Sequence, residues 1–186
     1  MNRKAILKLI RSTPPRCLRR FSAKRVPVPA KWDHDLVTAW KLVCPCGSSE
    51  GTVLGHPLAK LQRGCKDDGM FVSPFSFRCS RCRKGTKFLD TDADGTGAEL
   101  AKLEGSDIGC AAHRGKGRGQ PFPCPKCGTS RGEVVVALYF NEDYMDELEE
   151  DGIAFPFENL FSGVHVYSRC SGCGKQTMVT DLDTKY

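Results

Sequence analysis

Cys170-Ser171-Gly172-Cys173 decides the fold, because it completes a pattern of four close cysteine pairs. The earlier pairs are Cys44-Pro45-Cys46, Cys79-Ser80-Arg81-Cys82 and Cys124-Pro125-Lys126-Cys127. Two cysteines this close can place both sulfurs on one metal ion while the backbone turns its N–H groups toward the thiolates. Glycine follows three of the pairs and favours such a turn. Four pairs in alternating short and long spacing predict two metal sites of four cysteines each. Each close pair with its turn is called a knuckle here.

The segments around the pairs repeat. Counting from Cys82 and from Cys173, lysine, threonine, aspartate and aspartate recur at the same offsets, ending at Asp92 and Asp183. The first knuckles are each followed by a glycine and then by β-branched or aliphatic residues that favour a strand. Each half is therefore predicted to run knuckle, strand, insertion, strand, knuckle, strand. The insertions hold 32 and 42 residues, and long insertions cost little loop-closure entropy.

These observations predict a small, metal-stabilised, mainly β fold with a short helix, organised as two tandem zinc-ribbon-like modules after a basic N-terminal extension. The expected organisation is an extension over 1–32, disordered or targeting, a first module over 33–104, a linker or loop over 105–120 and a second module over 121–186. The short helix is expected at 142–150. The 186 residues fit one or two ordinary domains, and no apolar run approaches the roughly 20 residues that a membrane-spanning helix needs.

Zinc is the favoured metal, with two structural ions expected in the chain. The predicted ligands are Cys44, Cys46, Cys79, Cys82, Cys124, Cys127, Cys170 and Cys173. Four thiolates fill a tetrahedral zinc site and leave no open position for catalysis. The first pair has a single residue between its cysteines, so Cys65, His56, Cys110 or His113 stays open as a substitute ligand in the first site.

Disulfide bonds and a redox-active pair are the alternatives for these cysteines. An odd total of eleven and the absence of a recognisable signal peptide disfavour a secreted disulfide scaffold. The short β-rich segments after each pair differ from the strand and long helix that flank a thioredoxin-like site. The three unpaired cysteines, Cys17, Cys65 and Cys110, are either buried free thiols or reactive ones.

The charge of the chain is unevenly distributed. Of 28 lysines and arginines, ten lie in residues 1–32, which hold no acid, so 18 remain against 22 acids in residues 33–186, a net charge of −4 there. An amphipathic helix is possible before Pro14-Pro15, and Arg19-Arg20-Phe21-Ser22 resembles a mitochondrial processing site after Phe21. The extension is therefore a presequence, a tail that contacts RNA or anionic lipid, or plain disorder. The expected location is cytoplasmic, or the mitochondrial matrix if residues 1–21 are cleaved.

The run Asp90-Thr91-Asp92-Ala93-Asp94-Gly95 resembles the start of a calcium-binding loop. Its twelfth position would be Ala101 instead of glutamate, and Asp181 and Asp183 match its first two aspartates in the second half. A polar turn that belongs to the repeat is the favoured interpretation.

Beyond these patterns, the chain resembles a family of bacterial proteins with duplicated zinc ribbons. The resemblance spans roughly residues 36–183 and rests on the four knuckles, on Val53-Leu54-Gly55-His56-Pro57 and on Phe71-Val72-Ser73-Pro74. It implies the ligand assignment given above and no particular activity.

A non-enzymatic role is expected, because the sequence holds none of the common catalytic motifs. The favoured function is a protein-interaction adaptor with an unknown protein partner, in which strand edges and the acidic segment 142–158 dock a basic surface. Nucleic-acid binding through residues 1–32 and the Arg114–Arg118 loop is the first alternative. A thiol redox or metal-linked sensor is the second.

Overall fold

The computed structural model describes residues 3–29, 36–61, 69–104, 114–141, 145, 150 and 156–184. In chain order the elements are α1 (Arg3–Ser12), the 3₁₀ turn η1 (Arg16–Leu18), β1 (Lys24–Val26), β2 (Val37–Lys41), β3 (Glu50–Pro57), the 3₁₀ turn η2 (Leu58–Lys60), β4 (Phe71–Cys79), β5 (Gly85–Leu89), α2 (Thr96–Glu104), β6 (Gln120–Pro121), β7 (Arg131–Phe140), the 3₁₀ turn η3 (Phe157–Asn159), β8 (Phe161–Cys170) and β9 (Gln176–Asp183). The strands form one curled sheet, so the predicted mainly β fold is confirmed.

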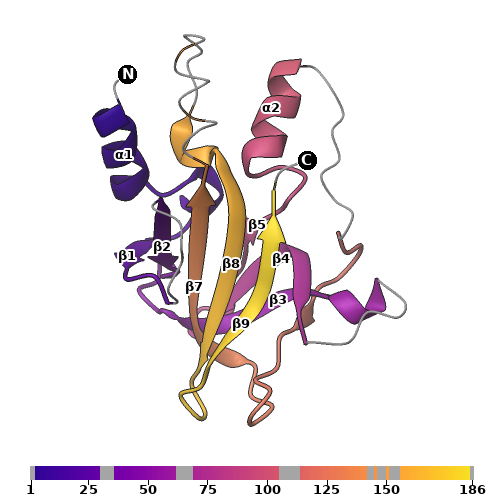
Figure 1. Ribbon diagram of the computed structural model, residues 1–186. Helices are drawn as coiled ribbons and strands as arrows, with labels where there is room; N and C mark the ends of the chain where they lie inside the picture. The colour runs from indigo at the N-terminus through magenta and orange to yellow at the C-terminus, as the bar shows by residue number, and fades with distance from the viewer. Residues whose placement is uncertain are drawn as a thin grey trace.

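The two sequence repeats form the same three-stranded antiparallel unit. The first unit is β3-β4-β5 and the second is β7-β8-β9 (Figure 1). Gly51 of β3 lies opposite Cys79 of β4, and the equivalent Gly132 of β7 lies opposite Cys170 of β8. The repeat predicted from the sequence is thus confirmed at the level of strand register.

A β-bulge occurs at the same place in both units. The register shifts between Phe75 and Ser76 where β4 meets β5, and between Val166 and Tyr167 where β8 meets β9. A bulge adds one residue to one strand and increases the local twist. Both units carry it at equivalent positions before the second knuckle.

The units meet through their first strands. β3 pairs antiparallel with β7, and Gly51 lies directly opposite Gly132. These residues occupy equivalent positions, so a local two-fold relationship passes between them. Both must be glycine, since a Cβ at Gly51 would overlap the ring of Phe77 and a Cβ at Gly132 would overlap the carbonyl oxygen of Arg169.

The segments that lead into the first knuckle of each half are exchanged between the units. The Leu42 N–H donates to the Val134 carbonyl of β7 at 2.9 Å, and the Phe122 N–H donates to the Val53 carbonyl of β3 at 3.0 Å. Accordingly β2 pairs with β7 and β6 pairs with β3. Each unit is completed by a segment of the other, which the sequence did not predict.

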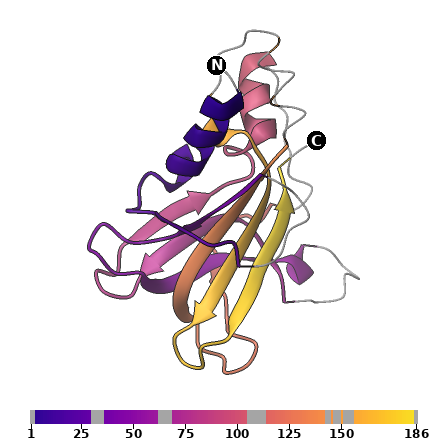
Figure 2. The same cartoon turned by 60° about the vertical axis from the view of Figure 1, so that its left-hand side comes forward.

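The main core lies between the inner faces of the two units, which cross at a steep angle in Figure 2. Alternate residues of β7, such as Val134 and Val136, point into it, as the period-two side-chain alternation of a strand requires. Phe75 and Phe88 of the first unit stack in this core with ring centroids 5.8 Å apart.

Residues 3–29 are packed onto this core, in contrast to the disorder considered for the extension. The expected amphipathic helix before Pro14-Pro15 forms as α1, and it buries Ile6 and Ile10. Leu18 and Phe21 are also buried, and the Phe21 ring meets that of Phe77 edge-on at 5.9 Å. Cleavage after Phe21 would remove all four side chains from the core.

Two ion pairs connect this segment to α2 and η3. Arg16 contacts Glu99 of α2 at 2.7 Å, and Arg19 contacts Glu158 of η3 at 2.5 Å. Both carboxylates are largely buried while both arginines are half exposed. Part of the N-terminal positive charge is therefore neutralised within the fold.

Some segments of the predicted organisation fall on described residues and others do not. Gln120 and Pro121, placed at the linker boundary, form β6, whereas residues 105–113 of the linker lie outside the described residues. Most of the acidic segment 142–158, including most of the helix expected at 142–150, also lies outside them, and Met145 and Glu150 are described as helical. None of the helices among the described residues is long and apolar enough to cross a membrane.

Truncation of Phe21 tests whether the N-terminal segment belongs to the core. We expect Phe21→Ala to lower the free energy of unfolding by about 3–4 kcal/mol, because a buried aromatic ring leaves a cavity. The matched control is Arg20→Ala at the exposed neighbouring position, with an expected change of less than about 0.5 kcal/mol. Urea unfolding followed by circular dichroism measures both. Equal stability of the two variants would contradict this packing.

Candidate metal centres

Each knuckle is a tight turn whose N–H groups and carbonyls are hydrogen-bonded in the same way. The Gly47 N–H donates to the Cys44 carbonyl at 2.7 Å, and the Gly128 N–H donates to the Cys124 carbonyl at 2.8 Å. Both glycines have positive φ angles of 89° and 74°. The glycines that follow these cysteine pairs are therefore required by the turn. In the knuckle without a glycine, Arg83 adopts the same left-handed conformation at φ 64°.

The structure brings the first and second knuckles of each half together. In the first cluster the sulfurs of Cys44 and Cys82 lie 3.6 Å apart, as do those of Cys46 and Cys79. Within this group all four sulfurs lie within 4.8 Å of one another. Tetrahedral Zn–S bonds of about 2.3 Å would separate the sulfurs by about 3.8 Å. The arrangement therefore suits a single metal ion.

The second cluster has the same geometry. The Cys124 and Cys173 sulfurs are 3.6 Å apart, and those of Cys127 and Cys170 are 3.5 Å apart. A disulfide needs about 2.0 Å between the sulfurs, and all eight cysteines are free. The two clusters are the groups that could hold a metal among the described residues.

The electrostatics of the first cluster favour a bound cation. Burial opposes ionisation of Cys79, but N–H groups of Cys82 and Arg81 stabilise its thiolate and lower its pKa to about 6. Burial raises the pKa of Cys44 to about 12, and hydrogen bonds with the neighbouring sulfurs add to this. One sulfur ionises easily and another resists, because several thiolates cannot share this space without a positive charge.

In the second cluster, too, the pKa of one thiol is lowered and the pKa of another is raised. The hydroxyl and N–H of Thr129 stabilise the Cys127 thiolate and lower its pKa to about 6. The pKa of Cys173 rises to about 11, since burial and the other sulfurs outweigh the hydrogen bond from the Lys175 N–H. A divalent cation would stabilise all four thiolates at once.

The substitute ligands considered for the first site are not needed to complete it. Cys46 occupies its place in the cluster although only one residue separates it from Cys44. His56 belongs to neither cluster and lies buried on β3 beside Gly115, where burial and the nearby Arg114 lower its pKa. Cys65, Cys110 and His113 lie outside the described residues.

The acidic run that follows β5 is held by a residue that sequence reasoning placed elsewhere. Asp90 is buried, and its carboxylate accepts two hydrogen bonds from Arg114 at 3.0 Å each. Arg114 also contacts Asp92 at 2.8 Å. Hydrogen bonding to Arg114 and Lys87 lowers the pKa of Asp90 although burial opposes it.

Two consequences follow from this ion pair. The run behaves as the polar turn favoured above, because Asp94 accepts the Asp90 N–H at 2.8 Å and Arg114 occupies the Asp90 carboxylate. Arg114 itself is committed to the fold, which weakens its proposed role in binding nucleic acid. No local signal connects residues 24 positions apart in the sequence, so the pair could be found only in the tertiary structure.

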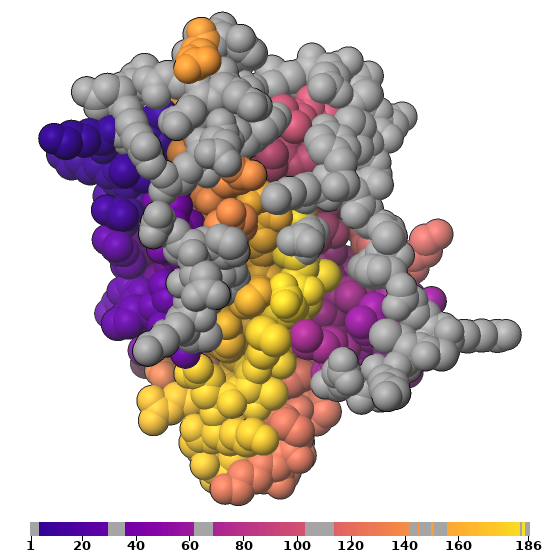
Figure 3. Space-filling view, viewed as in Figure 1, coloured from indigo at the N-terminus to yellow at the C-terminus, as the bar shows by residue number. Residues whose placement is uncertain are grey.

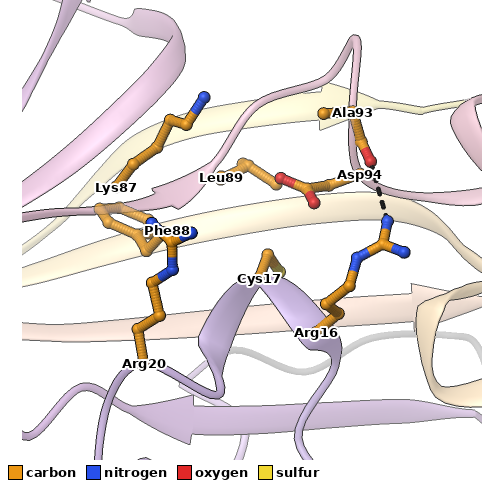
Figure 4. Close-up of a pocket in the computed structure, with 8 residues that line it drawn as sticks. All are labelled: Arg16, Cys17, Arg20, Lys87, Phe88, Leu89, Ala93 and Asp94. Atoms are coloured by element: carbon orange, nitrogen blue, oxygen red, sulfur yellow. Dashed lines mark hydrogen bonds between the residues drawn. The ribbon is translucent and has the colours of Figure 1, made fainter.

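Cys17 lies in a small cavity of about 170 Å³ beneath β5 (Figure 4). Arg16, Arg20 and Lys87 surround it, together with Phe88 and Asp94 among others. Burial, with the negative charge of Asp94 adding to it, raises the pKa of the Cys17 thiol far above its ordinary value. Since the thiolate is the reactive form, this disfavours Cys17 as a redox sensor.

Comparison of the chain with family models, with curated proteins and with solved structures gave no match. The resemblance to duplicated zinc-ribbon proteins therefore stays a prediction. The class of protein that the fold and the clusters define is a curled β sheet built from two equivalent units, each with one group of four cysteines.

Substitution of single cysteines tests the clusters. We expect Cys170→Ser to remove one metal ion per chain and to lower the melting temperature of the whole molecule, because the second cluster joins the two ends of its unit and the units are interlocked. Cys17→Ser is the control and should retain the full metal content. Mass spectrometry under native conditions measures the metal content of both variants, and thermal unfolding followed by circular dichroism measures their melting temperatures. An unchanged metal content in Cys170→Ser would contradict the assignment.

Proposed function

We propose that the chain is a non-enzymatic protein that binds two structural zinc ions, one in each cysteine cluster, and that it serves as a binding module for a partner protein. The observation that carries the zinc assignment is the convergence of four sulfurs within 4.8 Å at two equivalent places. Four thiolates saturate a tetrahedral ion and leave no position for water or substrate. The zinc would therefore stabilise the fold and take no part in catalysis.

Iron is the chemical competitor, since four thiolates arranged as a tetrahedron suit either zinc or iron. The two metals differ in ways that are simple to measure: zinc thiolate centres are colourless, whereas an iron centre absorbs visible light and is redox-active. The identity of the metal is therefore a question for the purified protein.

Metal analysis of the full chain tests this proposal. We expect two zinc ions per chain, matching the two clusters. After replacement by cobalt, the visible spectrum should show tetrahedral thiolate ligation, and Cys44→Ser and Cys124→Ser should each halve its intensity. Strong chelators should unfold the chain. A metal-free protein that stays folded in chelator would refute the proposal.

Nucleic-acid binding is a second candidate, favoured by a groove beside α1. The groove has a volume of about 380 Å³ and is lined by Lys4, Lys8, Arg11 and Arg25, with Leu7 and Ser12. None of the described residues that line it is acidic, and no acid among the described residues forms an ion pair with these four cations. Cations without acidic partners can contact a phosphate backbone.

Charge reversal tests this candidate better than deletion, because deletion of residues 1–32 would also remove core side chains. We expect Lys8→Glu combined with Arg11→Glu to weaken retention on RNA by at least about tenfold at low salt, since each lost phosphate contact reduces the salt-dependent binding energy. The double variant Lys84→Glu and Lys175→Glu, at exposed positions, has the same charge change and is the control. Equal weakening by both would indicate a response to net charge alone.

A further inference from the structure

A second groove lies between the outer edge of β9 in the second unit and the outer edge of β6, which pairs with β3 of the first unit. It has a volume of about 410 Å³ and is called the proline groove here; its walls include Pro57, Phe71, Pro121, Pro123, Thr177 and Met178. In Figure 3 the yellow surface of β9 meets the magenta of the first unit and the salmon of the segment near residue 120 on the visible face. β9 pairs with β8 and β6 with β3, and no strand among the described residues joins β9 to β6.

The equivalent cleft of the first unit is filled by the chain itself. There the lead-in segment at Val43 and the strand β5 correspond to Pro123 and β9. The Ser22 N–H donates to the Val43 carbonyl at 2.9 Å, and β1 continues this pairing along β2. η1 lies beside β5, where Cys17 contacts the same cavity as Lys87, the counterpart of Met178.

Residues 18–26, which fill the cleft of the first unit, show which side chains such a cleft accepts. Residues 18–26 run in extended or turn conformation, and they bury Leu18 and Phe21, which lie three positions apart. The proline groove presents comparable apolar walls, including Phe71 and Phe122, whose rings meet edge-on at 5.2 Å. Leu61, an exposed large hydrophobic side chain, follows the groove residue Lys60.

The backbone of the groove determines which hydrogen-bonding groups an occupant must supply. Pro121 and Pro123 have no N–H, so this edge can accept hydrogen bonds but offers few to donate. The Val43 carbonyl at the position of Pro123 accepts such a bond from Ser22 in the first unit. An occupant would donate its own N–H groups in the same way.

The charge of the groove selects the side chains of an occupant. Lys60 is exposed at the rim and donates to the Gln120 Oε1 atom at 3.1 Å. None of the described residues that line the groove is an aspartate or a glutamate. An acidic side chain would therefore be accommodated beside Lys60, whereas the basic residues of this chain's own N-terminal segment would be repelled.

We propose that the proline groove binds an extended segment of a partner protein that carries two apolar side chains three positions apart and an acidic residue beside them. The segment takes the place that residues 18–26 take on the first unit. This inference deepens the protein-binding part of the function proposed above and is independent of which metal the clusters hold.

Selection of peptides on the full chain tests the groove. A displayed library of random peptides is the probe, and we expect the enriched peptides to share the apolar pair and the neighbouring acid. Lys60→Glu should weaken an enriched peptide by about tenfold, equivalent to 1.4 kcal/mol. A peptide with lysine in place of its acid should bind the Lys60→Glu variant better than it binds the unaltered chain. Lys84→Glu, an equal charge change on the first unit, should leave binding unchanged.

Three results would overturn this proposal: no enrichment on a chain with its full metal content, enriched peptides that ignore Lys60→Glu, or a dimer of the chain that disappears with Lys60→Glu and shows a second copy in the groove. Metal content is measured on each sample. Peptide binding by a chain that contains no zinc would refute the zinc assignment and leave the groove standing, so the two failures are distinguishable.

Discussion

The antiparallel pairing of β3 with β7, in which Gly51 lies opposite Gly132, is the constraint on which the rest of the structure depends. Where these two strands meet, each lead-in segment lies along the first strand of the other unit. Leu42 and Phe122, which make the exchanged hydrogen bonds, stand two residues before Cys44 and Cys124. The first cysteine of each cluster is thus positioned by the opposite unit.

This interlocking explains how so many short strands hold together. The bulges lie at the same register in both units, and the inner faces of the units share one main core. The sulfur clusters join the strand ends at which the hydrophobic side chains of the core give way to exposed turns. Within each cluster the pKa of one thiol is lowered and that of another is raised, as expected for sulfurs packed this closely.

The local two-fold relationship is broken by the N-terminal segment, and both proposed binding surfaces arise from that break. The segment fills the cleft of the first unit, and the cleft of the second unit remains as the proline groove. The polar side of α1 places cations in its own groove, whereas Arg16 and Arg19 are held by acids of α2 and η3. Positive charge that has no acidic partner among the described residues therefore gathers beside α1.

The sequence by itself determined the knuckles, the duplicated order of strands and the amphipathic helix before Pro14-Pro15, because turn glycines, cysteine spacing and side-chain periodicity act over a few residues. The match between Asp90 and Asp181 holds in the sequence, but Asp181 lies within β9 whereas Asp90 begins the turn after β5. The tertiary structure alone decided the exchange of lead-in segments, the burial of Leu18 and Phe21 and the pairing of Arg114 with Asp90. These contacts join residues far apart in the chain, and their energy comes from packing and desolvation that no local pattern encodes.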